Sequence, residues 1–308
     1  MRALVTGAGG FCGSHLTRYL EDQGVEVHTI SERPARRERH HQVARVTDVG
    51  ALGRAVRLST PDYIFHLAGV MTSPDPIEFY RINTQFAVAL LRALADGGFS
   101  DRPVLLVGTA AEYGVVSEGE LPVSEELHPR PYNHYGISKL AQTLEGLSES
   151  RSGRPVTVVR PFNLVGPGMP EHLVLRSFAS QIAKIAKGDT PPFIAVGNIT
   201  ASRDFVDVRE AVMVYWKAIR NSDCYGEILN VCTGRGTVIE DALTALIQLA
   251  GVEVEVRADV SRLKVVDVPV HYGSTAKLTR LLGPLAMRPL HSSLNDILQD
   301  AMGRPCER

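Results

Sequence analysis

The sequence has few cysteines and no pattern among them. Its four cysteines, Cys12, Cys224, Cys232 and Cys306, form no CxxC pair and no metal-ligand spacing. We therefore expect free thiols in a reducing compartment and no bound metal.

The sequence also lacks an excess of charge of one sign and long apolar runs. The chain carries 33 Lys plus Arg against 34 Asp plus Glu, a net charge of −1, so it lacks the overall positive field that draws a protein to nucleic acid. No apolar run approaches the ~18 residues that cross a bilayer, and the apolar start is too short for a signal-peptide core. We expect a cytoplasmic protein with neither a nucleic-acid nor a membrane partner.

What is present is the composition of a globular protein. Hydrophobic residues make up 44% and charged residues 22% of the 308 positions, which excludes disordered, collagen-like and coiled-coil chains. At about 150 residues per domain, this length suits two domains or one large α/β unit.

Short β-branched runs alternate with helical patterns in the first half of the chain. We predict strands at 2–6, 25–30, 63–67, 104–107 and 156–159, and helices at 12–23, 78–96 and 134–150. Strands that alternate with helices form right-handed βαβ units. The sequence therefore predicts an α/β fold, a Rossmann-type doubly wound parallel sheet with helices on both faces.

This alternation ends after Arg160, where several prolines and glycines interrupt it before a helix expected at about 173–187. We predict a dinucleotide-binding Rossmann domain over 1–163, with segments near 205–233 returning to it. A smaller C-terminal substrate-binding lobe is expected mainly over 164–308.

A glycine loop directly follows the first predicted strand and opens the first helix. Gly7, Gly10 and Gly13 have the TGxxGxxG spacing, and Phe11 and Cys12 complete the loop. Such a loop turns sharply, brings backbone amides to a pyrophosphate and packs the helix closely on the sheet. At this place in a βαβ pattern it predicts a dinucleotide site; the alternative is a simple tight turn.

The end of the second predicted strand indicates which dinucleotide binds. NAD-binding folds usually place an acidic residue there for the ribose 2′-OH, whereas this chain has Ser31. Ser31 can hydrogen-bond a 2′-phosphate and Arg33 can neutralise it, so we predict NADP(H). Glu32 leaves NAD(H) open, and a solvated loop is the alternative for the arginine-rich segment 33–39.

Further cofactor contacts are predicted at other strand ends. Asp48 can accept a hydrogen bond from the adenine amino group, and the fourth strand ends close to the cofactor. The predicted set here is Asp48, Val49, Leu67, Ala68, Gly69 and Pro161.

Tyr135 and Lys139 stand at i and i+4, which places both on one face of a helix. A tyrosine has a pKa near 10 and needs a shift of roughly 3 units to exchange protons near neutrality. We expect the Lys139 ammonium to lower that pKa and also to hold the nicotinamide ribose. Thr109 can hold the substrate oxygen while Tyr135 moves the proton. Asn83 either supports Lys139 through water or is an ordinary surface residue.

Together these motifs resemble the extended short-chain dehydrogenase/reductase family, which acts on nucleotide sugars. The resemblance covers nearly the whole chain and rests on TGAGGFCG (6–13), DYIFHLAG (62–69), GTAAEYG (108–114), YGISK (135–139), RPFNLVGPG (160–168) and RDFVDVRE (203–210). Within the family, PDYIFHLAG, GTAAEYG followed by PVSEE, and YGEILNVCTG look most like the branch that reduces GDP-4-keto-6-deoxymannose.

The resemblance implies roles for individual residues. Thr109, Tyr135 and Lys139 match the family's catalytic triad. Asn163 matches an asparagine at the substrate, and Arg203 an arginine that clamps the nucleotide diphosphate.

It also implies a nucleotide pocket and an oligomeric state. Lys264 and Asp267 lie where the family often has an arginine and an acidic residue beside the nucleotide. Helices around 83–96 and 134–150 pair in this family, so a homodimer is expected.

One departure from the family concerns 4,6-dehydration. Dehydratases carry an acidic residue two positions after the catalytic threonine, where this chain has Ala111. Alanine cannot take a proton, so dehydration is not expected. Glu112, one position later, is expected to face the other way.

The resemblance thus predicts an NAD(P)H-dependent enzyme that reduces the 4-keto group of an NDP-4-keto-6-deoxyhexose. The alternative is a nucleotide-sugar 4-epimerase with tightly bound NAD. A third hypothesis, from another class, is a non-catalytic nucleotide-binding regulator.

Overall fold

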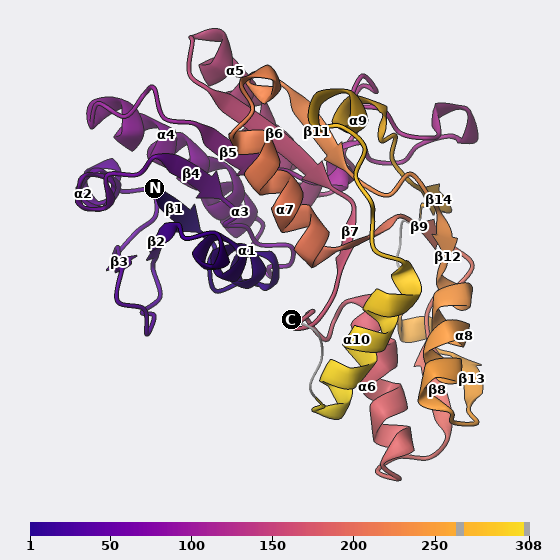
Figure 1. Ribbon diagram of the computed structural model, residues 1–308. Coiled ribbons are helices and arrows are strands. Elements are labelled where there is room, and N and C mark those ends of the chain that lie inside the picture. The colour runs from indigo at the N-terminus through magenta and orange to yellow at the C-terminus, as the bar shows by residue number, and fades with distance from the viewer. Residues whose placement is uncertain (263–267, 305–308) are drawn as a thin grey trace.

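The computed structural model describes residues 1–262 and 268–304, and a seven-stranded sheet lies at its centre (Figure 1). The strands are all parallel and run in the order β11-β6-β5-β4-β1-β2-β3. They are β1 (Arg2–Thr6), β2 (Glu26–Ser31), β3 (His40–Gln42), β4 (Tyr63–His66), β5 (Val104–Val107), β6 (Val156–Pro161) and β11 (Ile228–Val231). The chain order reverses between β1 and β4, and ligands of such sheets bind beside that point at the carboxyl ends of the strands. The predicted Rossmann-type α/β fold is confirmed.

Helices cover both faces of the sheet because its strands are apolar on both sides. In β1, Ala3 and Val5 pack on one side and Leu4 on the other, as the two-residue period of a strand requires. The first side is covered by α1 (Phe11–Asp22) and α7 (Val208–Ile219). The second is covered by α2 (Val49–Ser59), α4 (Phe86–Asp96) and α5 (His134–Arg151).

A second apolar core lies in the C-terminal half of the chain. Helices α6 (Val174–Ala186), α8 (Ile239–Ala250) and α10 (Leu290–Met302) pack around it, together with β8 (Phe193–Val196) and its parallel partner β13 (Glu255–Ala258). Figure 1 shows these elements gathered to one side of the large sheet. The segment near 205–233 supplies strand β11 to the large sheet and helix α7 to one of its faces. The domain boundary at residue 163 stays a prediction.

Small sheets join the two parts. Strand β7 (Asn163–Val165) pairs with β10 (Phe205–Asp207), and β9 (Ser202–Arg203) lies between β12 (Thr237–Val238) and β14 (Val270–His271). The remaining short helices are η2 (Ala110–Glu112), η3 (Glu118–Glu120), η4 (Ser222–Cys224), η5 (Val260–Arg262) and α9 (Ala276–Leu282).

The stretch predicted as a helix over 78–96 is helical throughout, but it is not a regular α-helix along its whole length. The structure divides this stretch into α3 (Pro76–Phe79), a π-helical turn η1 (Tyr80–Gln85) and α4. A π turn adds a residue to the helical repeat and so changes which side chains face inward, and such turns are frequent at functional sites. Asn83 lies in this turn and is fully buried.

Cys12, Cys224 and Cys232 are free, and Cys306 lies outside the described residues. No helix within the described ranges has the length and hydrophobicity that a membrane span requires.

Candidate active site

The glycine loop lies between β1 and α1, against the segment that follows β4. Gly7 has φ +71°, and a Cβ on it would lie 2.7 Å from the Ala68 nitrogen. A Cβ on Gly13 would lie 2.1 Å from the Gly7 carbonyl oxygen. Both positions therefore require glycine, and the loop packs closely on Leu67 and Ala68.

The start of α1 is open and suits an anion. Its N-cap, Gly10, provides no side-chain cap, whereas Asp48, Asn133 and Asp207 cap α2, α5 and α7. Gly9 and Gly10 are exposed, and no atom lies within 4 Å of a Cβ placed on Gly9. Uncapped amides at a helix N-terminus bind phosphate groups. The loop therefore fits the pyrophosphate of a dinucleotide.

Thr6 and His66 join the glycine loop to the end of β4. The Thr6 hydroxyl hydrogen-bonds His66 Nδ1 at 2.9 Å and accepts the Ala68 amide at 3.2 Å. Burial, helped by the charge of Lys139, lowers the pKa of His66 to about 3, so the ring is neutral at ordinary pH. Neither residue was predicted as a site residue, although His66 directly precedes the predicted Leu67-Ala68-Gly69 contact.

Thr109, Tyr135 and Lys139 lie together at the carboxyl end of β5. Asn133 caps α5 by accepting the Gly136 amide at 2.8 Å, which places Tyr135 in the first turn of the helix. The Thr109 side chain lies beside the Tyr135 hydroxyl and favours the ionised form of the phenol. Lys139 is buried, and its Nζ donates to the Val107 carbonyl at 2.9 Å and to Gln142 Oε1 at 3.0 Å.

The expected lowering of the Tyr135 pKa by Lys139 is not what the structure shows. Burial raises the pKa of Tyr135 above its usual value, and the Thr109 side chain opposes that rise only in part. Lys139 is itself desolvated, which lowers its pKa to about 8 although Glu112 favours its charged form. Gln142, missed by the sequence analysis, is i+3 from Lys139 and could have been found from helical spacing.

Asn83 is a buried connector rather than a surface residue. Its Oδ1 accepts the Val70 amide at 2.8 Å, and its Nδ2 donates to the Val70 carbonyl at 3.0 Å and to Ser138 Oγ at 2.9 Å. A Cβ on Gly69 would lie 3.2 Å from both Asn83 Oδ1 and Lys139 Nζ. Asn83 thus holds the segment after β4 against the helix turn that carries Lys139.

The carboxyl end of β2 carries the residues expected to select the dinucleotide. Ser31 Oγ donates to the Arg33 carbonyl at 2.6 Å, and Arg33 is exposed. The neighbouring Glu32 is engaged elsewhere, since Arg81 Nη1 donates to its Oε1 at 2.6 Å. Burial alone would raise the pKa of Glu32, but hydrogen bonds from Arg81 and Val46 outweigh it and lower that pKa.

The other predicted cofactor residues are distributed around the loop. Asp48 accepts the Ala51 amide at 3.0 Å as the N-cap of α2 and is exposed. Phe11 packs partly on the second core, which places the glycine loop beside the C-terminal half of the chain. Burial raises the pKa of the Cys12 thiol to about 12, so it is an unreactive packing residue. Val49 packs in the core beneath α2, and Pro161 ends β6 buried.

The predicted substrate residues lie where the two parts of the chain meet. Asn163 begins β7 and is exposed. Arg203, in β9, donates through Nη1 to the carbonyls of Ser202 and Val268 at 2.8 and 2.6 Å. Lys264 and Asp267 lie outside the described residues.

Glu112 lies in the short helix η2 and not in the strand-like segment from which its direction was expected, and its carboxylate lies behind Thr109. It is fully buried and pairs with Arg160 Nη2 at 2.8 Å. Its other oxygen accepts the Thr109 amide at 2.9 Å, and Thr109 Oγ1 accepts the Ala111 amide at 3.2 Å. Together these bonds hold the short helix η2 that carries Thr109.

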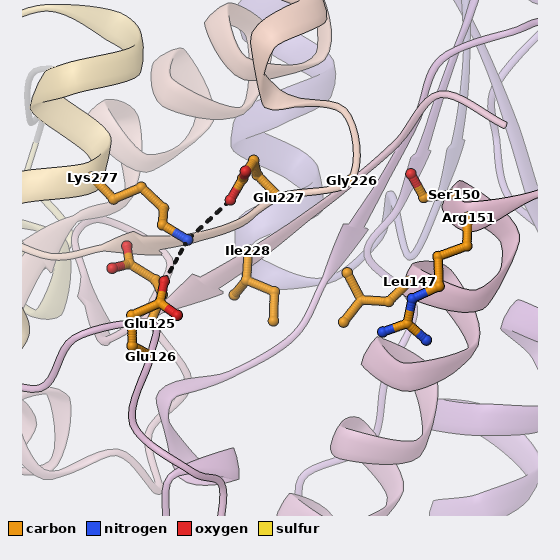
Figure 2. A pocket seen from close by; sticks show the side chains of 9 residues that line it. All are labelled: Glu125, Glu126, Leu147, Ser150, Arg151, Gly226, Glu227, Ile228 and Lys277. Atoms are coloured by element: carbon orange, nitrogen blue, oxygen red, sulfur yellow. Dashed lines mark hydrogen bonds and ion pairs between the residues drawn. The ribbon is translucent and has the colours of Figure 1, made fainter. Parts of the chain in front are cut away.

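A cavity of about 540 Å³ lies away from this cluster, between the end of α5, β11 and α9 (Figure 2). Lys277 enters it and pairs with Glu126 at 3.2 Å and Glu227 at 2.9 Å. None of the predicted site residues lines it. Because Lys277 is already paired with two glutamates and no predicted site residue lines the cavity, the candidate active site remains the cluster at the strand ends.

The fold, together with the glycine loop and the arrangement of Tyr135 and Lys139, defines an enzyme that uses a nicotinamide dinucleotide. Comparison with known proteins identifies the family. The profile of the NAD dependent epimerase/dehydratase family matches residues 3–232. The chain therefore belongs to that family, which confirms the predicted family and a nicotinamide-dependent enzyme.

Individual relatives are similar over nearly the whole chain. GDP-6-deoxy-D-mannose reductase of Pseudomonas aeruginosa is 34% identical, with 97% of this chain and 96% of the relative covered. GDP-6-deoxy-D-talose 4-dehydrogenase of Aggregatibacter actinomycetemcomitans is 31% identical, with 92% of each covered. UDP-glucose 4-epimerase of Azospirillum brasilense is 28% identical, with 98% and 91% covered.

Solved structures agree with the fold. RMD from Pseudomonas aeruginosa complexed with NADPH superposes with a TM-score of 0.87 at 33% identity, covering 98% of this chain and 99% of that one. Thermus thermophilus UDP-glucose 4-epimerase in complex with NAD has a TM-score of 0.84 at 24% identity, covering 98% and 99%. At 24% identity, the similarity to the epimerase structure supports the fold alone.

Proposed function

We propose that this protein is an NADP(H)-dependent reductase of a 4-keto nucleotide sugar. Its substrate is an NDP-4-keto-6-deoxyhexose of the GDP-4-keto-6-deoxymannose type. The observation that carries the proposal is the placement of the Thr109 side chain beside the Tyr135 hydroxyl, one helical turn from buried Lys139 and beside an open glycine loop. The two relatives above 30% identity, which act on GDP-6-deoxy sugars by name, support this substrate class.

The site residues suit reduction of a carbonyl group. A bound nicotinamide dinucleotide supplies the hydride. Thr109 positions the carbonyl oxygen, and Tyr135 donates its proton to that oxygen as negative charge develops. The raised pKa of Tyr135 keeps the phenol protonated near neutral pH, which is the form that a reduction needs. Lys139 would hold the nicotinamide ribose from its buried position one helical turn from Tyr135.

The surroundings of Thr109 disfavour dehydration. The residue two positions after Thr109 is Ala111. The carboxylate of the neighbouring Glu112 is already paired with Arg160 and accepts a hydrogen bond from the Thr109 amide. This supports a reductase over a 4,6-dehydratase.

The end of β2 supports NADP(H) as the cofactor. Ser31 and exposed Arg33 offer a hydroxyl and a positive charge to a 2′-phosphate. The charge of Glu32 is neutralised by Arg81. The relative solved with NADPH agrees with this preference, and NAD(H) is the second cofactor to test.

The nucleotide diphosphate is proposed to lie between the glycine loop and the C-terminal half of the chain. Asn163 and Arg203 bind it there, together with Lys264 and Asp267. A protein of this kind works in the cytoplasm, where nucleotide sugars and NADPH are made.

We also propose that the protein is a homodimer through α4 and α5. Ile137 and Leu144 are i and i+7 on α5 and are 40% and 58% exposed, and Val88 on α4 is 39% exposed. Apolar side chains repeated along one helix face favour burial against a second helix pair.

A nucleotide-sugar 4-epimerase is the second candidate, because UDP-glucose 4-epimerases are also similar to the chain. It would use the same triad but retain tightly bound NAD through its cycle. The nucleotide released from purified, denatured protein separates the two: stoichiometric NAD indicates the epimerase.

The deciding experiment is a panel of GDP-, UDP- and dTDP-linked 4-keto-6-deoxy sugars, each with NADPH and NADH. We expect NADPH oxidation with a GDP-linked substrate and formation of a single C4 alcohol, identified by NMR. Absence of cofactor oxidation with every keto sugar, together with epimerisation of UDP-glucose, would reject the reductase.

A further inference from the structure

Glu32 lies at the end of β2 and is held by two donors. Its Oε1 accepts the Val46 amide at 2.9 Å and Arg81 Nη1 at 2.6 Å, while its Oε2 accepts Arg81 Nη2 at 3.3 Å. Both side chains are about 30% exposed, at 30% and 29%. The carboxylate is therefore fixed in position as well as neutralised.

Arg81 is itself anchored on the other side. Its Nε and Nη2 donate to the two carboxylate oxygens of Glu78, each at 2.8 Å, one turn earlier in the same helical stretch. The guanidinium thus lies between two carboxylates and uses its planar fork for both. Because Glu78 fixes Arg81, Arg81 in turn fixes Glu32.

The position of Glu32 makes this arrangement matter for the cofactor. Glu32 is adjacent to Ser31, the residue at which NAD-binding folds usually carry the acid for the ribose 2′-OH. A free carboxylate there would accept that hydroxyl and repel a 2′-phosphate. Held by Arg81 and Val46, Glu32 does neither, and Arg33, the next residue, is exposed and carries a positive charge.

We infer that Arg81 selects the cofactor by withholding Glu32 from the ribose. This inference rests on the proposed use of NADP(H) and deepens it, since it assigns the selectivity to a residue on the helix after β4. Arg81 acts through Glu32, so it is a positioning residue for specificity.

The test compares dinucleotide affinities in three variants of the full chain. Arg81→Met leaves Glu32 with the Val46 amide alone and without a neutralising cation, and we expect the ratio of NADH to NADPH dissociation constants to fall about tenfold or more. Arg81→Met combined with Glu32→Gln removes the freed charge and returns the ratio to within about twofold of the wild type. Arg92→Met removes another arginine, paired with Asp96 on α4, and leaves the ratio unchanged.

Affinities are measured by calorimetry or by quenching of Trp216 fluorescence, without sugar substrate. An unchanged ratio in folded Arg81→Met overturns the inference. If Arg81→Met does not fold, Glu32→Gln alone decides. If Glu32 is held away from the ribose, the ratio of NADH to NADPH dissociation constants in Glu32→Gln stays within about twofold of the wild type. A clear gain in preference for NADPH in that variant would show that Glu32 already reaches the ribose.

The wild-type protein separates this inference from the proposed function. Failure of the wild type to bind NADPH rejects the NADP(H) proposal. Binding of NADPH with no response to Arg81→Met rejects only the role of Arg81.

Discussion

Glu112 and Arg160 form a buried ion pair directly behind Thr109. Glu112 Oε2 lies 2.8 Å from both Nε and Nη2 of Arg160, and the two side chains are 0% and 1% exposed. The Arg160 guanidinium also lies over the Tyr113 ring, 4.6 Å from its centroid. Since Glu112 accepts the Thr109 amide, the pair connects β6 to the threonine that we propose positions the carbonyl group.

Breaking this pair on one side is expected to destabilise the fold. Arg160→Met leaves the Glu112 carboxylate buried without its cation and should lower the free energy of unfolding by about 3–5 kcal/mol. The double variant Arg160→Met with Glu112→Gln should lose less, because the amide keeps the bond to Thr109 without a charge. Urea denaturation measures both. A single variant as stable as the double would contradict this account.

The glycine loop offers a matched pair of substitutions. Gly13→Ala puts a Cβ 2.1 Å from the Gly7 carbonyl, so the loop must shift, whereas Gly9→Ala meets no atom within 4 Å. We expect Gly13→Ala to weaken NADPH binding by about tenfold or more and Gly9→Ala to change it by less than about twofold. Calorimetric titration measures both. Equal NADPH affinities of the two variants would show that the glycine loop is not part of the binding site.

Tyr135 is expected to be needed for turnover and not for cofactor binding. Tyr135→Phe removes the proton donor and should reduce kcat by about 10²–10⁴-fold, the usual worth of general acid catalysis. NADPH affinity should stay within about twofold of the wild type. Steady-state kinetics and a binding titration give the two values. Near-full activity of Tyr135→Phe would refute the proposed mechanism.

His66 predicts a loss of stability in acid. Its pKa is about 3 in the folded protein against 6.5 in the unfolded chain. Between these values the unfolded state binds a proton that the native state does not, so stability is complete above 6.5 and falls as pH drops toward 3. From pH 6.5 to 5 the wild type should lose about 2 kcal/mol more than His66→Asn. If the unfolding free energies of the wild type and of His66→Asn changed with pH in the same way, His66 would not be a neutral buried residue.

The apolar face of α5 predicts the oligomeric state. Leu144→Glu should convert a dimer to a monomer, because a charge at the centre of the interface loses its water. Leu58→Glu, at a position 72% exposed on α2, is the control and should leave the dimer intact. Light scattering after size-exclusion chromatography distinguishes the species. Dimers that persist in Leu144→Glu would place the interface elsewhere.

Local patterns made the fold and much of the site predictable. Alternating strands and helices indicated the parallel sheet because the period of two and the period of 3.6 differ in sequence. The spacing of Gly7, Gly10 and Gly13, and of Tyr135 and Lys139, depends on residues within one loop or one helical turn. The π turn around Asn83 left no such pattern, because its extra residue is set by packing against Val70 and Ser138.

The sequence by itself determined the sheet, the nucleotide loop and the helical spacing of the catalytic pair, since each follows from near neighbours in the chain. Only the tertiary structure decided which charges meet: Glu112 with Arg160, 48 residues apart, and Glu32 with Arg81, 49 residues apart. Such partners come together through the packing of separate elements, and neither periodicity nor spacing encodes that packing. The same packing desolvates Tyr135 and Lys139, so their pKa values follow from burial and not from the interval between them.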